Sequence, residues 1–369
     1  MALGLFQSGQ VALDIGGSSV VALEITGSPG KLKLRNCVEW PLSEGLVVDG
    51  EIVAADLLAR ELKAFANQHK LRGRPVELAV SNQKVIVRNI DMPEMTEDEL
   101  RGAIEFQAQD YIPIPIDEVV LDFQVIGRYV NPEGASRQQV LLVAAQKAMI
   151  AMYTAAIKQA GLKLTGIDVC SMALVRALIP PTPFLAEGPQ SGTCRAIADI
   201  SSSVSTLVVV VDNVLKFTRV INFSSDRFAR VLSEQRNIPL EDANMLVQHI
   251  GLAGKYEPDD SVYSEEVITQ TQQRLGEVAL ELSDEIRRSL HYFQGQELNT
   301  PVTQVILSGR GALVRNLDNH LADSLSMPVE IGNPMTLISE NASTTADADL
   351  AFMSPYLAVA VGLALPEEE

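Results

Sequence analysis

The residues best suited to chemistry lie in a short hairpin near the start of the chain. Residues 11–25, VALDIGGSSVVALEI, pass from apolar residues into a polar turn and back into an alternating apolar strand. Backbone N–H groups in such a turn bind anions, and a carboxylate beside them holds a hydrated divalent cation. The pattern predicts a site for a nucleotide phosphate with Mg²⁺, although a short Gly-Ser stretch also occurs in ordinary hairpins. The residues of the turn that would bind are Asp14, Gly16, Gly17, Ser18 and Ser19.

Residues 195–210, RAIADISSSVSTLVVV, repeat this plan later in the chain. An apolar strand leads to Asp199, and the hydroxyl-bearing Ser201, Ser202 and Ser203 precede a β-branched strand. Two such hairpins, one in each half of the chain, are typical of a cleft in which two loops grip one phosphate chain. The acids Asp14 and Asp199 would then hold Mg²⁺ through water. A chance likeness between two common hairpins is the alternative, and the matching order of elements around both copies argues against it.

Composition restricts the class of protein. The 369 residues suffice for two domains. The 29 Lys and Arg against 47 Asp and Glu give a net charge of -18, which repels nucleic acid and anionic lipid, so we expect neither as a partner. Three isolated cysteines without metal-ligand spacing indicate a reducing compartment. No leader and no apolar run near the roughly 20 residues of a membrane span is found, so we expect a cytoplasmic protein without direct membrane insertion.

The first hairpin needs a sheet around it, and the residues that follow supply one. Strands are expected at 31–39, 76–81 and 85–90, in a mixed sheet covered by an amphipathic helix at 54–69. The hairpin would form the edge of a cleft on this sheet.

Residues 92–146 depart from that rhythm and are interpreted as an inserted subdomain. Thr96, followed by three acidic residues, is an N-terminal helix signal, and Pro113 and Pro115 end the helix in an extended segment. The predicted organisation is a first domain at 1–91 and 147–180, the insertion, a linker rich in Pro and Gly, and a second domain whose last helix returns to the first. The linker is expected at 181–193 and the second domain at 194–365.

The order of these motifs resembles that of the actin-like ATPase superfamily, in which two domains share an α/β, ribonuclease H-like fold. Within it the chain is similar, over nearly its full length, to the PilM family of type IV pilus assembly proteins, relatives of the cell-division protein FtsA. The most specific segments are residues 109–127, 284–293 and 356–365. The insertion resembles the subdomain that this superfamily calls 1C, between a first domain 1A and a second domain 2A and 2B.

The resemblance implies roles for particular residues. Asp168 corresponds to an acid that faces the magnesium-bound water, and it is the one catalytic candidate. Besides the two hairpin loops, the cofactor-binding candidates are those of a helix that lines an adenosine pocket and of an adenosine loop: Glu285, Arg288, Ser289, Gly309, Arg310 and Gly311. The residues of the insertion expected to contact a partner, with Tyr111 preferred, are Phe106, Tyr111, Ile112 and Pro113.

Several residues depart from the family pattern around the nucleotide, among them Ala243, Asn244 and Val247, where an Ala-Glu pair and a following Lys near the ribose are common. Ser201 stands where Gly is usual in the second loop, Val21 where Lys is common after the first, and Arg310 where Gly is usual in the adenosine loop. A side chain at Ser201 narrows the approach of the backbone to phosphate. We therefore expect ATP and Mg²⁺ to bind weakly or not at all, with slow or no hydrolysis.

The preferred function is a cytoplasmic scaffold of type IV pilus assembly, held at the inner face of the cytoplasmic membrane through a partner. The resemblance implies a groove for the N-terminal cytoplasmic peptide of a PilN-like bitopic inner-membrane protein, contacts with other pilus-machine subunits, and ATP as a conformational ligand. The alternatives are an active Mg-ATPase or small-molecule kinase, a filament-forming actin-like protein, and a relative from type II secretion or cell division. No kinase substrate loop is recognisable, and no basic amphipathic end typical of FtsA is found.

Overall fold

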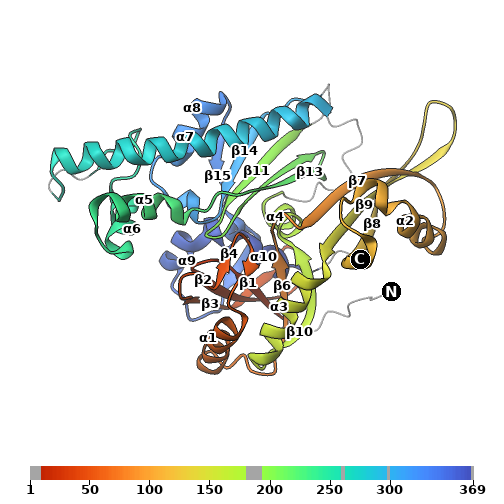
Figure 1. Cartoon of the computed structure of the whole chain (residues 1–369), viewed down its shortest axis with the longest axis horizontal. Coiled ribbons are helices and arrows are strands. Elements are labelled where there is room, and N and C mark those ends of the chain that lie inside the picture. Colours follow the sequence, from red (N-terminus) through yellow and green to blue (C-terminus); the bar gives the residue numbers. More distant parts are fainter. Residues whose placement is uncertain (1–9, 180–192, 259–261, 297–299, 367–369) are drawn as a thin grey trace.

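Two sheets form the body of the protein, and a third forms the insertion (Figure 1). The computed structural model describes residues 10–179, 193–258, 262–296 and 300–366. The first sheet has the order β10-β6-β1-β2-β3-β16 and the second β13-β12-β11-β14-β15. The bounds of the first are β1 Val11–Ile15, β2 Ser19–Thr26, β3 Leu32–Pro41, β6 Pro75–Val80, β10 Lys163–Val169 and β16 Ile338–Asn341. Those of the second are β11 Cys194–Ile200, β12 Ser205–Val211, β13 Val214–Ile221, β14 Gln304–Ser308 and β15 Val329–Ile331.

The two body sheets repeat one strand plan. β1 pairs antiparallel with β2 and parallel with β6, while β11 pairs antiparallel with β12 and parallel with β14. The two predicted hairpins are thus confirmed as equivalent elements of the two halves. Asp14 and Asp199 both lie near the end of the first strand of their hairpin, just before the loop.

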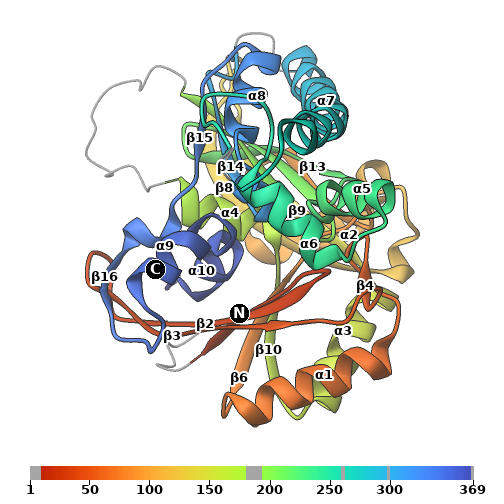
Figure 2. The ribbon, with the colours of Figure 1, turned by 90° about the vertical axis from the view of Figure 1, so that its left-hand side faces the viewer.

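Helices cover both outer faces of the body and fill the space between its sheets (Figure 2). α1 and α3 pack on the first sheet, and α5, α6, α7 and α8 pack on the second. α4 and α10 lie between the sheets in a core that includes residues of both. The bounds are α1 Ala55–Gln68, α3 Lys147–Gln159, α4 Cys170–Leu178, α5 Asp226–Arg236, α6 Leu240–His249, α7 Glu265–Gln296, α8 Leu317–Leu325, α9 Asp347–Met353 and α10 Ala358–Ala364. Short elements are β4 Val47–Val48, β5 Glu51–Ile52 and the 3₁₀ helices Ile116–Glu118, Arg310–Leu313, Pro334–Leu337 and Ser354–Tyr356.

The central helices α4 and α10 cross at very close range. A Cβ atom on Gly362 of α10 would lie 1.9 Å from the carbonyl oxygen of Ala173 in α4. Only glycine fits, because this contact is with backbone rather than with a flexible side chain. α10 also packs on β1 and β2, so the C-terminal helix lies against the first half of the chain.

The insertion is a three-stranded sheet with one covering helix. Its strands β7 Val85–Pro93, β8 Val119–Val130 and β9 Ser136–Gln146 have the order β7-β9-β8, and α2 Glu97–Tyr111 packs on one face. Thr96 caps α2 as predicted, in a reciprocal arrangement with Glu99. The sequence predicts the strand at 85–90 as part of the first sheet, and this prediction is wrong. The strand belongs to the insertion, since β7 pairs with β9 along its whole length.

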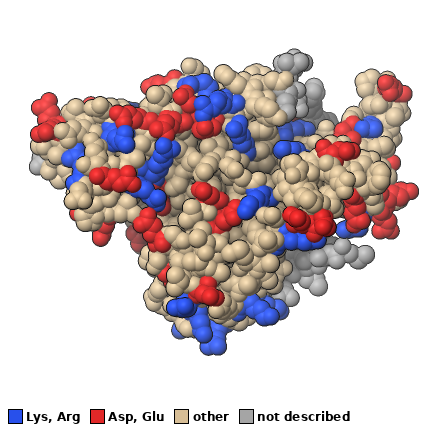
Figure 3. All heavy atoms as spheres, in the orientation of Figure 1, with Lys and Arg blue, Asp and Glu red and all other residues tan. Residues whose placement is uncertain are grey.

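Surface charge is unevenly spread. Acidic side chains gather over the insertion, at the right-hand end of the molecule in Figure 3. In the part of the chain that the structure describes, no single helix is long and apolar enough to cross a membrane. The helix pair Asp347–Tyr356 and Ala358–Ala364 reaches that length and hydropathy only together, and it is bent by 95°. Most of the predicted linker at 181–193 lies outside the described residues.

Candidate functional site

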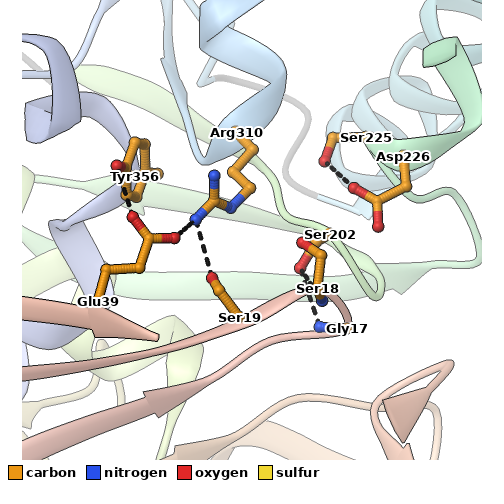
Figure 4. A network of polar contacts seen from close by, with 9 residues as sticks. All are labelled: Gly17, Ser18, Ser19, Glu39, Ser202, Ser225, Asp226, Arg310 and Tyr356. Atoms are coloured by element: carbon orange, nitrogen blue, oxygen red, sulfur yellow. Dashed lines mark hydrogen bonds and ion pairs between the residues drawn. The ribbon is translucent and has the colours of Figure 1, made fainter. Parts of the chain in front are cut away.

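The two Asp-bearing loops contact each other directly across the cleft between the body sheets (Figure 4). The backbone N–H groups of Gly17 and Ser18 donate to the Ser202 hydroxyl oxygen, over 2.9 Å and 3.4 Å. A neighbouring N–H, that of Gly50, donates to the Ser203 hydroxyl over 2.7 Å. The Ser202 oxygen therefore occupies the position on the first loop that a phosphate oxygen would take.

The two acids of the loops are held in a buried environment. Burial, the nearby Asp199 carboxylate and Glu39 raise the pKa of Asp14 to about 7, although Arg310 opposes them. Burial also raises the pKa of Asp199, against hydrogen bonds from Ser201 and Ser308 that favour its charged form. Two carboxyl groups that resist being charged together bind a proton or a cation readily. This pair fits the chemistry of a hydrated divalent ion, as the sequence predicted for Asp14 and Asp199.

Arg310 joins the two halves of the cleft. Its guanidinium forms an ion pair with Glu39 on β3 and donates to the Ser19 hydroxyl over 2.8 Å. Its central carbon also lies 4.3 Å from the centre of the Tyr356 ring, and the Tyr356 hydroxyl donates to Glu39 over 3.0 Å. All four groups are partly or wholly shielded from solvent, so this network holds the second half of the chain against the phosphate loop of the first.

A further ion pair spans the mouth of the cleft. Arg230 of α5 lies 3.0 Å from Glu44, in the loop after β3. Asp226, at the start of α5, accepts a hydrogen bond from the Ser225 hydroxyl (Figure 4), and burial raises its pKa against the nearby Arg310 and Arg230. The cleft is thus bridged at its mouth as well as at its phosphate loops.

Little space remains between these contacts. The cavity amounts to about 60 Å³, against the roughly 300–1,000 Å³ of pockets that bury small molecules. Its lining includes Asp14, Gly16, Ser19, Asp199, Ser201, Ser202, Ser203 and Arg310 from the predicted cofactor site. The donor set fits a metal-bound phosphate, whereas the present spacing of the loops admits one only after the halves move apart.

The predicted adenosine residues are placed differently from the phosphate loops. Ser289 is fully buried and donates to the Glu285 carbonyl oxygen, while Arg288 pairs with Glu285 at the surface of α7. None of these residues lines the cavity. Gly309 and Gly311 serve packing: Gly309 has a φ of 77°, and a Cβ on either residue would lie within 2.6 Å of Ile200.

Asp168, the catalytic candidate, does not line the cavity either. Its carboxylate forms an ion pair with Arg176 of α4 and accepts a bond from the Val169 N–H over 2.7 Å. Arg176 in turn donates to the Gly362 carbonyl oxygen of α10 over 2.8 Å. In this conformation the ion pair between Asp168 and Arg176 links β10 to α4 and, through Gly362, to α10.

A second hollow, of about 310 Å³, lies between the insertion and the second half of the body. One wall is β7 and the other β13, and each is the outermost strand of its sheet. Asn89 donates to the Leu215 carbonyl oxygen over 2.6 Å, and Lys216 to the Gln139 side chain over 3.0 Å. We call this hollow the β7–β13 groove; its lining residues are Val87, Arg88, Asn89, Ile90, Asp91, Gln139, Leu215, Lys216, Phe217, Thr218 and Tyr292.

The predicted partner-binding residues lie away from that groove. α2 covers one face of the insertion's sheet, with Val140 and Leu142 beneath it, while Leu141 of the same strand faces the body. Phe106 and Pro113 are exposed and Tyr111 is 37% exposed, so the structure leaves them accessible. Ile112 is only 3% exposed and belongs to the core beneath α2.

Sequence reasoning missed Glu39, Tyr356, Gly50 and the whole β7–β13 groove. Glu39 and Tyr356 reach the cleft only through strand pairing and the return of the C-terminal segment, which no local pattern reports. The groove residues come from four segments that lie far apart in the sequence, in β7, β9, β13 and α7. The one available signal was Glu39, the only acidic residue in the expected strand at 31–39.

Residues 12–368 match the family model described as type IV pilus assembly protein PilM. The chain belongs to the PilM family. A solved PilM-PilN type IV pilus biogenesis complex contains a chain that is 28% identical, with a TM-score of 0.78 over 96% of this chain and 97% of that one. The family assignment from the motifs is therefore confirmed.

More distant structures share the fold. The ethanolamine utilization protein EutJ from Carboxydothermus hydrogenoformans is 12% identical, with a TM-score of 0.53 over 98% of this chain and 90% of that one. MreB5 of Spiroplasma citri, solved with ADP bound, is 15% identical, with a TM-score of 0.54 over 96% and 95%. These likenesses confirm the predicted two-domain actin-like fold for this PilM-family chain.

Proposed function

We propose that this chain is a scaffold of type IV pilus assembly that docks an extended segment of a PilN-like partner in the β7–β13 groove. Membership of the PilM family supports the role in pilus assembly. The similar chain solved in a PilM-PilN complex supports a partner of that kind. The observation that carries the choice of site is the 310 Å³ hollow between two unpaired strand edges.

The groove has the chemistry of strand addition. The outer edges of β7 and β13 present backbone N–H and C=O groups that no further strand of their sheets pairs with. Five consecutive β7 residues line it, enough for a bound segment of about five residues at roughly 3.3 Å per residue. The Asn89 Oδ1 atom is buried without a hydrogen-bond partner, so a backbone N–H of the segment would satisfy it. Phe217 and Tyr292, whose rings lie 5.9 Å apart, supply an apolar seat.

The body cleft has a separate role in this proposal, as a conformational site. Mg²⁺ would be held through water by Asp14 and Asp199, and the phosphates by the N–H groups of the Gly16–Ser18 turn. Because the Ser202 hydroxyl now accepts from the Gly17 and Ser18 N–H groups, and Arg310 binds the neighbouring Ser19 hydroxyl, nucleotide binding requires the two halves to separate. β13 belongs to the second half, so separation would also widen the β7–β13 groove.

The partner also sets the location of the protein. A PilN-like protein of the inner membrane would hold this chain at the cytoplasmic face. No direct membrane contact is then needed, in agreement with the net charge of -18.

The test is titration of the full chain with a fluorescent synthetic peptide of the N-terminal cytoplasmic segment of a PilN-like partner, followed by anisotropy. We expect saturable 1:1 binding that Tyr292→Ala weakens about tenfold, because the ring is the apolar anchor of the groove. Tyr292 is 57% exposed, so its removal should leave the fold intact. Tyr256→Ala is the matched control, since this tyrosine is 50% exposed and lies outside the groove.

The two ways of failing are distinguishable. No binding by the unaltered chain would contradict the proposed function. Binding that Tyr292→Ala leaves unchanged would contradict the groove as the site while the function stands.

A further inference from the structure

The outward face of α2 is an unusual surface for a helix that only covers a sheet. Its core face is formed by Leu100, Ile104 and Ala108. Phe106 lies two residues after Ile104, about 200° around the helix, and therefore points away from the sheet. It is 86% exposed, the most exposed of the large apolar side chains in the described part of the chain.

Gly102 stands one turn before Phe106 on this face. A Cβ atom there would have no neighbour within 4 Å, so no packing contact inside the protein requires glycine. Glycine in a helix interior costs roughly 0.5–1 kcal/mol relative to alanine. The missing side chain leaves an open surface beside the Phe106 ring, and no other residue of the described fold packs there.

The same segment carries much of the negative charge of the protein. Residues 94–122 contain nine acidic residues and one basic residue, a net charge of -8 out of -18 for the whole chain. All nine acidic residues are exposed: Glu94, Glu97, Asp98, Glu99, Glu105, Asp110, Asp117, Glu118 and Asp122. Among them, in the described part of the chain, only the carboxylates of Glu94 and Glu97 form ion pairs, while Lys147 donates to the backbone carbonyl of Asp117.

We infer that this outward face, Phe106 with the acidic residues around it, is a second docking surface, for a basic polypeptide segment that carries an apolar anchor. Charge selects the occupant. Nucleic acid, anionic lipid and the acidic bulk of a second copy are repelled, whereas a segment rich in Lys and Arg is attracted and steered. The exposed ring beside Gly102 receives the anchor and the acids receive the flanking cations.

The surface is independent of the β7–β13 groove. α2 packs on the face of the insertion's sheet opposite to the one that Leu141 and Val87 turn toward the body. The Thr96 capping box holds the start of α2, and its three core residues pack along its length. One partner segment can therefore occupy the groove while another occupies α2.

The experiment selects binders to the full chain from a random 16-residue peptide library displayed on phage, with counter-selection on Phe106→Ala. We expect the enriched peptides to carry a net positive charge and at least one large apolar residue. Phe106→Ala should weaken them about tenfold, and the double variant Glu105→Lys/Asp110→Lys at least as much. The control Glu265→Lys/Glu266→Lys makes the same charge change at the exposed start of α7 and should leave their affinity unchanged.

Other results would overturn the inference. These are the absence of any enriched peptide, enrichment of neutral or acidic peptides, or an equal loss in the α7 control, which would indicate diffuse attraction. Tyr292→Ala must leave the selected peptides unaffected, so this outcome is separate from the test of the groove.

Discussion

The candidate binding groups of the body cleft and those of the insertion differ in whether they already have partners inside the protein. In the cleft the groups predicted to bind a ligand already bind each other: Ser202 caps the N–H groups of Gly17 and Ser18, and Arg310 holds Ser19 and Glu39. On α2 the ring of Phe106 is 86% exposed, and most of the acids around it form no ion pair within the described chain. A ligand of the cleft must displace internal contacts, whereas a partner of the insertion only adds contacts. The residues that stand ready for binding are thus those of the insertion.

The largest expected effect tests whether Arg310 keeps the cleft closed. Removing its ion pair and its contact with Tyr356 should raise the population of the open state, so Arg310→Ala should raise the affinity for Mg-ATP about tenfold or more. Isothermal titration calorimetry measures this, with the exposed Arg274→Ala as control. A fall in affinity would instead mean that Arg310 contacts the nucleotide, as the sequence predicted.

Replacing a glycine by alanine should change the stability of the protein in opposite directions in the two regions. A Cβ on Gly311 would lie 2.5 Å from the Ile200 Cβ, so Gly311→Ala should destabilise the protein by about 1–3 kcal/mol through overpacking. At Gly102 the space is open, so Gly102→Ala should stabilise it by about 0.5–1 kcal/mol. Urea unfolding of both variants makes the comparison, and a loss of stability at Gly102 would show a packing role for that face.

The buried acids of the cleft predict a pH dependence of stability. The pKa of Asp14 is raised from 3.8 to about 7 in the folded protein, so protonation of Asp14 favours the fold. That stabilisation is complete below its unfolded pKa and is lost as the pH rises through about 7. Because Asn does not ionise, Asp14→Asn should be more stable than the unaltered chain at about pH 8, by on the order of a few kcal/mol, and equal to it near pH 4. Thermal unfolding at both pH values is the measurement, and a constant difference would contradict the raised pKa.

The smallest effect separates the two faces of the insertion. Tyr111 was the preferred partner residue from the sequence, yet it lies beyond the lining of the β7–β13 groove. Tyr111→Ala should therefore change the affinity for the PilN-like peptide by less than about twofold, while Tyr292→Ala changes it about tenfold. A large loss at Tyr111 would move the peptide site to the α2 face.

Local patterns were sufficient for the framework of this protein. Alternating apolar residues around Asp14 and Asp199 predicted both hairpins, and Thr96 with its acidic first turn predicted the start of α2, because hairpin and capping signals act over a few residues. The family followed from the order of such motifs along the chain.

Tertiary structure decided the state of each site. Whether a Gly-Ser loop is open to phosphate depends on what faces it, and Ser202 lies 185 positions after Gly17 in the chain. β7 pairs with β9 of the insertion and not with a strand of the body, so its free edge forms one wall of the groove against β13. The packing of α2 buried Ile104 and left Phe106 outside, because the helical period sends residues two positions apart to opposite faces. Contacts of this kind join residues distant in sequence, so no local pattern could report them.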